Sequence, residues 1–273
     1  MNKEVQEFLA SFPYAEMTKD SYGRVLVQLV ELRLDQLTAA ELLSFVCRPE
    51  WGSNMRYVAL CACRRFISWR YGPRHAALSA RVRPGVARRQ RVLTVDLALE
   101  LLASFDTSHA KGARDLSLAA VALDTGLRCS ELCRLALPDV DLDRRVLQVI
   151  VKGGQWGSAV FSRETAQYIR EWLVFRRPAD GVMNLFVGSR SGLGLTREGL
   201  KKIVRDWGLS IGIKLSPHDF RRSFATLSTI FGAPSRVVQV AGRWSGIEMV
   251  EHYTRDIQAR EIEPYLPMAR LGR

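Results

Sequence analysis

The sequence predicts a mainly α-helical protein of two domains, with a small β-sheet or hairpin in the second, and three observations support this fold class. Apolar residues recur at helical spacing along most of the 273 residues. The composition becomes β-rich in "VDLDRRVLQVIVKGGQWGSAVFS", which has two adjacent glycines at a turn. An arginine-rich stretch, "RVRPGVARRQR", separates a shorter helical part from a longer mixed part. We expect a helical domain over residues 1–78, a linker over 79–92 and a mixed α+β domain over 93–273.

The first domain is expected to consist of short helices. "TKDSYGRVLVQLVELR" has helical apolar spacing, with Thr18 as its candidate N-cap. "TAAELLSFV" follows, with Thr38 and Glu41 at the spacing of a capping box. "SNMRYVALCACRRFISWRYGP" predicts a longer helix that ends at a Gly-Pro pair. The small residues, arginines and proline of residues 76–92 predict an extended linker.

A capping signal at Thr94, in "TVDLALELLASF", opens the second domain. A hairpin is expected in the middle of this domain, with Gly153 and Gly154 at its turn. The expected helices cover residues 94–105, 112–124, 129–136, 163–176, 196–209, 217–230, 234–241 and 246–253.

The formal net charge is +12, and the positive charge is unevenly placed. Residues 51–91 contain ten arginines and no acidic residue, together with Tyr57, Phe66, Trp69 and Tyr71. A basic stretch with interleaved aromatic residues indicates contact with a polyanion. An ordinary solvated basic face is the alternative, and charge alone does not decide between the two.

Composition and the N-terminal segment exclude several classes of protein. No run of about 18 uncharged apolar residues occurs, so no membrane span is predicted. The N-terminal "MNKEVQEFLASF" has acidic residues among its apolar ones and no small-residue cleavage site, so a signal peptide is not expected. The five cysteines have apolar neighbours and are expected to be buried free thiols in a cytoplasmic protein. Cys129 and Cys133 fit one helix face, but no second Cys or His pair follows at metal-site spacing, and no metal is expected.

The stretch "SPHDFRR" has the features of a helix start. Ser216 suits the N-cap, Pro217 the first helical position and Asp219 the third position of a capping box. His218 and Arg221 then lie within about one turn on one face. A helix N-terminus presents free N–H groups and partial positive charge, which favour a bound phosphate. The alternative is a surface turn with a solvated histidine, and this motif taken alone favours that alternative.

Two further motifs contain candidate basic residues. In "TGLRCSEL", Gly126 permits a tight turn before Arg128, and Glu131 is spaced to hold the Arg128 guanidinium. A structural ion pair is the alternative for this motif. "VKGGQ" places Lys152 at the tip of the hairpin, where an ordinary surface lysine is the alternative.

Together with "HDFRRSFAT" and "AGRWSGIEMVEHYTR", these motifs stand in the order and approximate spacing of the tyrosine recombinase (phage integrase) family, which the chain resembles over nearly its whole length. The resemblance implies an N-terminal core-binding domain of helices and a C-terminal catalytic domain. The short chain has no additional arm-binding domain, which favours a Xer-like or mobile-element recombinase. The catalytic residues that the resemblance implies are Arg128, Lys152, His218, Arg221, Trp244 and Tyr253.

Among the tyrosines, Tyr253 takes the role of nucleophile because it follows Trp244 by nine residues, as in the family. Composition alone does not separate it from Tyr265. The sequence departs from the family pattern in two places. Arg243 occupies a position where a small or apolar residue is commoner, and "KGGQWGS" replaces the more usual lysine- and arginine-rich turn.

The implied residues suit the cleavage of a phosphodiester. Negative charge develops on the non-bridging oxygens, and two arginines can bind these oxygens bidentately. Tyrosine has an unperturbed pKa of about 10, so its attack needs a nearby base or cation, and His218 is suited to assist. The leaving 5′-oxygen needs a proton, which a flexible Lys152 can supply. A 3′-phosphotyrosine link conserves the bond energy, so neither a cofactor nor a metal is expected.

The resemblance implies that a homo-tetramer binds double-stranded DNA at two inverted-repeat recombination sites. A type IB topoisomerase, which relaxes DNA as a monomer, is one alternative, and the C-terminal tail that recombinases exchange between protomers distinguishes the two. A DNA-binding relative without activity is the other alternative, and the presence of all six catalytic positions argues against it. The candidate DNA-binding residues are Arg56, Arg64, Arg65, Arg70, Arg81, Arg83, Arg88, Arg89 and Arg91.

Overall fold

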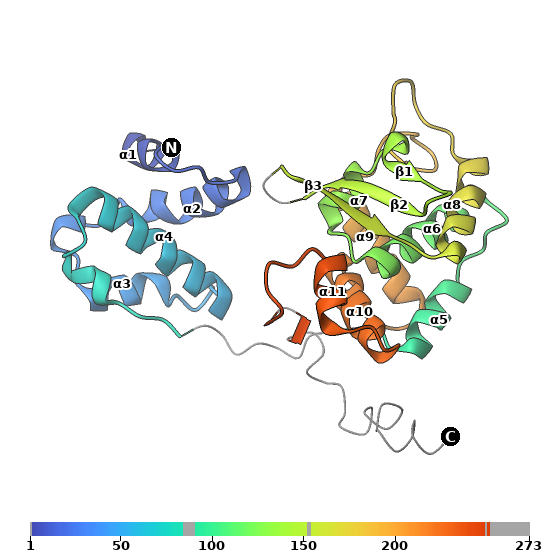
Figure 1. The fold of residues 1–273 in the computed structure, drawn as a ribbon. Coiled ribbons are helices and arrows are strands. Elements are labelled where there is room, and N and C mark those ends of the chain that lie inside the picture. Colours follow the sequence, from blue (N-terminus) through green and yellow to red (C-terminus); the bar gives the residue numbers. More distant parts are fainter. Residues whose placement is uncertain (1, 84–90, 152–153, 249, 252–273) are drawn as a thin grey trace, which may run out of the picture. The chain divides into compact units, whose positions relative to one another are not determined.

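The computed structural model is mainly α-helical with one small antiparallel sheet, as the sequence predicts (Figure 1). The chain forms two compact units, residues 1–88 and residues 89–273, and each has its own hydrophobic core. The structure describes residues 2–83, 91–151, 154–248 and 250–251.

The first unit is helical in its described part. The long helix α4 packs against α1, α2, α3 and η2. In the core, Phe8 of α1 meets Phe66 of α4 edge to face with ring centroids 5.3 Å apart, and Leu26 and Leu42 are fully buried around them. The elements are α1 (Lys3–Ala10), α2 (Glu16–Leu29), η1 (Leu34–Gln36), α3 (Ala39–Val46), α4 (Ser53–Tyr71) and η2 (Ala76–Ser79).

Local capping signals predict two of the helix starts correctly. The Thr38 hydroxyl accepts a hydrogen bond from the Glu41 N–H at 3.2 Å, and the Glu41 carboxylate accepts one from the Thr38 N–H at 2.8 Å. Thr94 accepts a hydrogen bond from the Leu97 N–H at 3.2 Å at the start of α5. Both starts follow the predicted capping chemistry.

The predicted N-cap at Thr18 is wrong, because α2 begins at Glu16 and Thr18 lies inside the helix. The ring of Tyr14 packs against Phe8 and Phe12, with centroids 6.2 and 5.3 Å apart. The Tyr14 hydroxyl also accepts a hydrogen bond at 3.0 Å from Arg65 of α4, 51 positions along the chain. Tertiary packing of this kind can override the local preference of a threonine.

The first unit also extends further along the chain than the expected linker start. Residues 76–79 form η2, which packs against α3 and α4. Ala77 and Ala80 are 0% and 1% exposed, so these small side chains fill the core. Residues 84–90, which include Arg88 and Arg89, lie outside the described residues.

In the second unit, helix α6 packs against α8 on one side and α10 on another, and its described residues are largely buried. Between residues 94 and 241, the helices of the second unit begin and end within two residues of the predicted ranges. The helices are α5 (Val95–Ala103), α6 (Ala110–Thr125), α7 (Cys129–Arg134), α8 (Arg163–Phe175), α9 (Arg197–Ser210), α10 (Pro217–Ile230) and α11 (Ser235–Ala241), with a 3₁₀ turn η3 (Leu137–Asp139) before the sheet.

The three strands form an antiparallel sheet in the order β1-β2-β3, and they are β1 (Val140–Asp141), β2 (Val146–Ile150) and β3 (Trp156–Val160). Leu147 pairs with Ala159 across β2 and β3, and both side chains are buried in the core. Ile150 pairs with Trp156 beside the hairpin turn, and both are exposed. The predicted hairpin is therefore present, with one face on the core.

The described helices do not include one that is long and apolar enough to cross a membrane. Within the same residues, no three His, Cys, Asp or Glu side chains gather in a way that could hold a metal ion.

Candidate active site

The turn after α6 presents Arg128. Gly126 ends α6 with a left-handed φ of 56°, and a Cβ at this position would lie 2.6 Å from the ring of Phe224 in α10. Glycine is therefore needed both for the backbone conformation and for the close approach of α10. The backbone N–H and the guanidinium of Arg128 both donate to the buried carboxylate of Glu131, at 2.8 and 2.7 Å. The ion pair fixes the guanidinium and leaves 36% of the Arg128 side chain exposed.

The segment "SPHDFRR" begins α10, as the sequence predicts. The carboxylate of Asp219 accepts hydrogen bonds from the N–H and the hydroxyl of Ser216, both at 2.8 Å. Its other oxygen accepts a hydrogen bond from Arg222 at 3.0 Å. These contacts fix the first turn of the helix, which carries His218 and Arg221.

Arg221 joins two turns that are far apart in the sequence. One terminal nitrogen of its guanidinium donates to the carbonyl oxygen of Gly126 and the other to that of Gly242, both at 2.6 Å. The residue is 2% exposed, and its guanidinium carbon lies 4.3 Å from the centroid of the Trp244 ring. The cation is thus removed from bulk water and held by two carbonyl groups and an aromatic face.

Trp244 belongs to a small core of its own. Its ring is stacked on Phe224 with centroids 6.1 Å apart, and Val238 and Val250 are buried in the same cluster. Val250 comes three residues before Tyr253, so this cluster anchors the chain that leads to the expected nucleophile. Tyr253 itself lies outside the described residues.

The pKa of His218 is lowered from its usual value of 6.5. Partial burial of the ring is the main cause, followed by the positive charges of Arg222 and Arg221, while Asp219 opposes the shift and Arg128 adds to it. The imidazole is therefore neutral near pH 7, which is the form that can accept a proton.

Four of the six predicted catalytic residues are thereby brought together: Arg128, His218, Arg221 and Trp244. Lys152 lies outside the described residues. The backbone on either side of it is paired, since the Val151 N–H donates to the Gln155 carbonyl at 2.8 Å.

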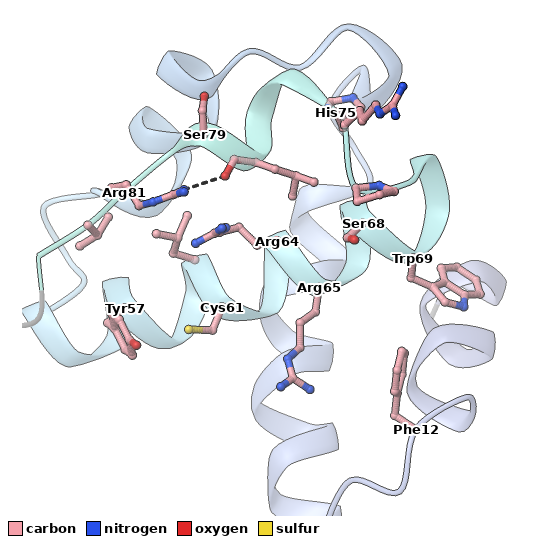
Figure 2. Close-up of a pocket in the computed structure, with 15 residues that line it drawn as sticks. Phe12, Tyr57, Cys61, Arg64, Arg65, Ser68, Trp69, His75, Ser79 and Arg81 are labelled. Atoms are coloured by element: carbon pink, nitrogen blue, oxygen red, sulfur yellow. Dashed lines mark hydrogen bonds between the residues drawn. The ribbon is translucent and has the colours of Figure 1, made fainter.

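The first unit has an open pocket of about 1010 Å³ beside α4. Arg64, Arg65 and Arg81 line it together with Tyr57 and Trp69 (Figure 2). Guanidinium groups can bind the phosphates of a nucleic acid, and aromatic rings can contact its bases. Three of the nine arginines predicted to bind DNA therefore lie at one place.

Arg56 and Arg70 are engaged elsewhere in the first unit. Arg56 donates to the carbonyl of Arg48 at 2.9 Å. Arg70 forms an ion pair with Glu4 at 3.0 Å, and about half of each side chain is exposed. Surface pairs of this kind contribute little to stability, but this one neutralises part of the positive charge of Arg70.

The remaining predicted DNA-binding arginines belong to the end of the first unit and to the expected linker. Arg83 is exposed. The Arg91 guanidinium donates to the carbonyl of Lys214 within the second unit. Arg88 and Arg89 lie outside the described residues.

Two arginines at these sites were not among the predicted residues. Arg74 lines the pocket in the first unit, and its membership of the acid-free stretch was the signal that could have found it. Arg243 reaches the turn before Arg128, where its guanidinium donates to the Thr125 carbonyl at 2.9 Å. The sequence marks Arg243 only as a departure from the family pattern.

The fold and this cluster of basic side chains define a class of protein, and comparison with known families identifies it. Residues 91–260 match the model described as the phage integrase family. This match covers more than half of the chain. The chain therefore belongs to the phage integrase family, whose members include the tyrosine recombinases described next.

The chain is similar to tyrosine recombinase XerD of Listeria innocua, with 32% identity over 181 residues, or 64% of this chain and 61% of the relative. It thus spans about three fifths of the length of that relative. Tyrosine recombinase XerC of Mycobacterium leprae is 29% identical over 238 residues, or 81% of this chain and 80% of the relative.

Solved structures share the fold at low sequence identity. The integrase of the transposon Tn1549, solved in complex with transposon right end DNA, has a TM-score of 0.77 at 18% identity, covering 99% of this chain and 98% of that one. The XerH site-specific recombinase, bound to a palindromic difH substrate, has a TM-score of 0.75 at 18% identity, covering 91% and 79%.

Proposed function

We propose that this chain is a site-specific DNA recombinase that cleaves and rejoins DNA strands through a 3′-phosphotyrosine intermediate. The convergence of Arg128, His218, Arg221 and Trp244 in one site is the observation that carries the proposal. Membership of the phage integrase family supports it, since relatives in that family are named tyrosine recombinases.

The two arginines bind the scissile phosphate. Arg128 is held by its ion pair with Glu131, and part of its side chain is exposed. The guanidinium of Arg221 lies over the face of the Trp244 ring. Both groups are already oriented when the substrate arrives, so they can stabilise the charge of the pentavalent transition state. Arginine suits this role because its planar fork matches a pair of phosphate oxygens.

Tyr253 attacks the phosphorus, and its phenol proton leaves as the new bond forms. The neutral His218 accepts this proton, because nearby arginines disfavour its protonated form in the free protein. The negative charge that arrives with the phosphate then offsets the charges of these arginines and stabilises the imidazolium.

Lys152 donates a proton to the departing 5′-oxygen, which leaves as a hydroxyl. The DNA strand remains attached to the protein by its 3′-phosphate. A 5′-hydroxyl of a partner strand then attacks the phosphotyrosine, and the same groups act in reverse to release Tyr253.

The substrate is double-stranded DNA with an inverted-repeat site, on which four protomers act at two sites in the cytoplasm. The first domain supplies the pocket of Arg64, Arg65 and Arg81, and the linker arginines contact the DNA backbone. A cyclic, head-to-tail exchange of C-terminal tails links the four protomers.

Covalent capture tests the proposal. A random-sequence duplex library is incubated with the protein, the reaction is stopped with detergent, and DNA that remains attached to protein is recovered and sequenced. We expect an inverted repeat to emerge. A nicked duplex of this sequence then traps the adduct on a denaturing gel, and Tyr253→Phe should bind the duplex but form no adduct. An adduct that persists in Tyr253→Phe contradicts the assignment and points to Tyr265.

A further inference from the structure

Arg243 has a backbone conformation that residues with a Cβ rarely adopt. Its φ is 57°, and the other non-glycine residue with a positive φ in the described part of the chain is Arg145. This left-handed conformation is unfavourable for an L-amino acid with a side chain. An arginine at this position therefore indicates that its side chain makes contacts that offset the cost.

Arg243 and Arg221 donate hydrogen bonds to the same two turns. The Arg243 guanidinium donates to the carbonyls of Thr125 and Ala241, at 2.9 and 2.7 Å. Arg221 donates to the carbonyls of the next residue in each turn, Gly126 and Gly242. The two guanidinium groups thus bridge the same two turns through four hydrogen bonds, which reach two consecutive carbonyls in each turn.

The remaining surroundings of Arg243 connect it to the proposed catalytic groups. Burial lowers the pKa of Arg243. The charge of Glu131 opposes this shift and the charge of Arg128 adds to it, so both partners of that ion pair lie close to Arg243. A Cβ on Gly157 in β3 would lie 3.5 Å from the Arg243 Cδ, so the stem of the side chain packs against the hairpin that contains Lys152.

This arrangement matters when a phosphate binds. The anion competes with the carbonyls of Gly126 and Gly242 for the donors of Arg221, and any loss of these bonds would let the two turns separate. The bridge from Arg243 to Thr125 does not depend on those donors. It can therefore keep the two turns, and with them Arg128 and Trp244, in place.

We propose that Arg243 is a positioning residue that holds the turn at 125–126 against the turn at 241–242 while Arg221 engages the scissile phosphate. This inference rests on the proposed function. It assigns Arg243 no contact with DNA.

The variant Arg243→Gly tests the proposal, and Arg145→Gly is its matched control. Both changes remove the strain of a left-handed φ, because glycine adopts this conformation readily. Arg145 is exposed and belongs to the turn before β2. We expect Arg243→Gly to slow adduct formation on the nicked duplex roughly 10- to 100-fold, the scale of a small misplacement of reacting groups. Arg145→Gly should cleave at the wild-type rate.

The salt dependence of DNA binding separates positioning from direct contact. A lost phosphate contact lowers the slope of log affinity against log salt by about one unit. Arg243→Gly should leave this slope unchanged. A reduced slope would overturn the proposal and make Arg243 a phosphate ligand.

Hydrogen exchange in the free protein gives a readout that needs no activity. Arg243→Gly should speed amide exchange in peptides that cover 125–128 and 241–244, whereas Arg145→Gly should not. Unchanged exchange in both segments would refute the bridge. If wild-type protein forms no adduct with any duplex, the proposed function fails, and this exchange measurement still tests the bridge.

Discussion

The guanidinium carbon of Arg221 lies 4.3 Å from the centroid of the Trp244 ring, and the same ring is stacked on Phe224 with centroids 6.1 Å apart. The Trp244 ring therefore contacts the buried cation through its face, while two carbonyl groups accept hydrogen bonds from the terminal nitrogens of Arg221. A cation in this position is oriented before any substrate arrives, which is the property that electrostatic catalysis requires.

Replacement of Trp244 should separate its effect on cleavage from its effect on folding. In Trp244→Ala we expect the free energy of unfolding to fall by about 3–5 kcal/mol, because a large buried ring is lost. The rate of adduct formation should fall roughly 5- to 30-fold, which corresponds to a cation–π contact of about 1–2 kcal/mol. Trp244→Phe keeps an aromatic face under Arg221 and should retain most of the rate. Urea unfolding and single-turnover gels measure the two effects, and equal rates for Ala and Phe variants would contradict the support role.

The role of Lys152 can be tested with a modified leaving group. Lys152→Ala should slow cleavage by roughly 10²–10⁴-fold, the usual contribution of a general acid. A substrate with sulfur in place of the 5′-bridging oxygen leaves without protonation, so it should restore much of the lost rate. Quench-flow or gel assays on both substrates make the comparison. Absence of rescue by sulfur would mean that Lys152 positions the phosphate instead.

The sequence predicts those parts of the fold that depend on local chemistry. Helix starts at Thr38 and Thr94 follow from residues within one turn, so their caps could be read directly. Thr18 is not the cap, because α2 begins at Glu16. The neighbouring Tyr14 accepts a hydrogen bond from Arg65, 51 positions away, and local signals do not reveal such a contact. The alanines of η2 resembled a linker because small side chains are compatible with both a loop and a tight core position.

The same distinction applies to the site. Local motifs predicted that Arg128 precedes a short helix and that His218 and Arg221 lie in the first turn of α10. The ion pair of Arg128 with Glu131 is an i, i+3 contact that the sequence indicates. The bond from Arg221 to Gly126 spans 95 positions, so only the folded chain reveals it. The contribution of Arg243 was missed for the same reason.

The lowered pKa of His218 has a measurable consequence for stability. The ring binds its proton less tightly in the folded protein than in the unfolded chain, whose histidine pKa is near 6.5. The stabilising effect is therefore present above that pH and is lost as the pH falls from 6.5 through the folded-state pKa. Unfolding free energies across this window should fall less steeply with acid in His218→Gln than in wild type. Identical slopes would show that the ring titrates normally.

The charge of Arg222 should account for part of this shift. Removal of that charge in Arg222→Gln should raise the pKa of His218 toward 6.5, which NMR titration of the ring measures. The pH below which cleavage declines should move upward in the same variant, because His218 acts in its neutral form. A pKa that stays unchanged would attribute the shift to burial and to the charges of Arg221 and Arg128.

The pocket in the first unit should contribute to DNA affinity. Arg64→Ala and Arg81→Ala should each weaken binding to all duplexes and lower the salt slope by about one unit per lost phosphate contact. Arg70→Ala serves as a control, because its guanidinium is paired with Glu4. Fluorescence anisotropy at several salt concentrations measures both quantities. Equal losses for Arg70 and the pocket residues would show that affinity depends on total charge and not on this pocket.

Truncation after Asp256 tests the proposed tetramer. The removed segment has apolar residues among charges, and we expect it to dock on a neighbouring protomer. The shortened protein should still fold and bind a single site but should assemble poorly on two sites, as gel mobility and light scattering would report. Full assembly without the tail would mean that the segment covers its own domain. A full-length protein that stays at one protomer per site and relaxes supercoiled DNA would be a topoisomerase.

The two hydrophobic cores have no described residue in common, and every hydrogen bond reported around Arg221 joins residues between 125 and 244. A substitution of Phe8 or Phe66 therefore removes packing from the core of the first unit, whose described members include neither Phe224 nor Trp244. A helical unit grafted from a relative should therefore bring its own core with it and leave the packing inside the second core unchanged.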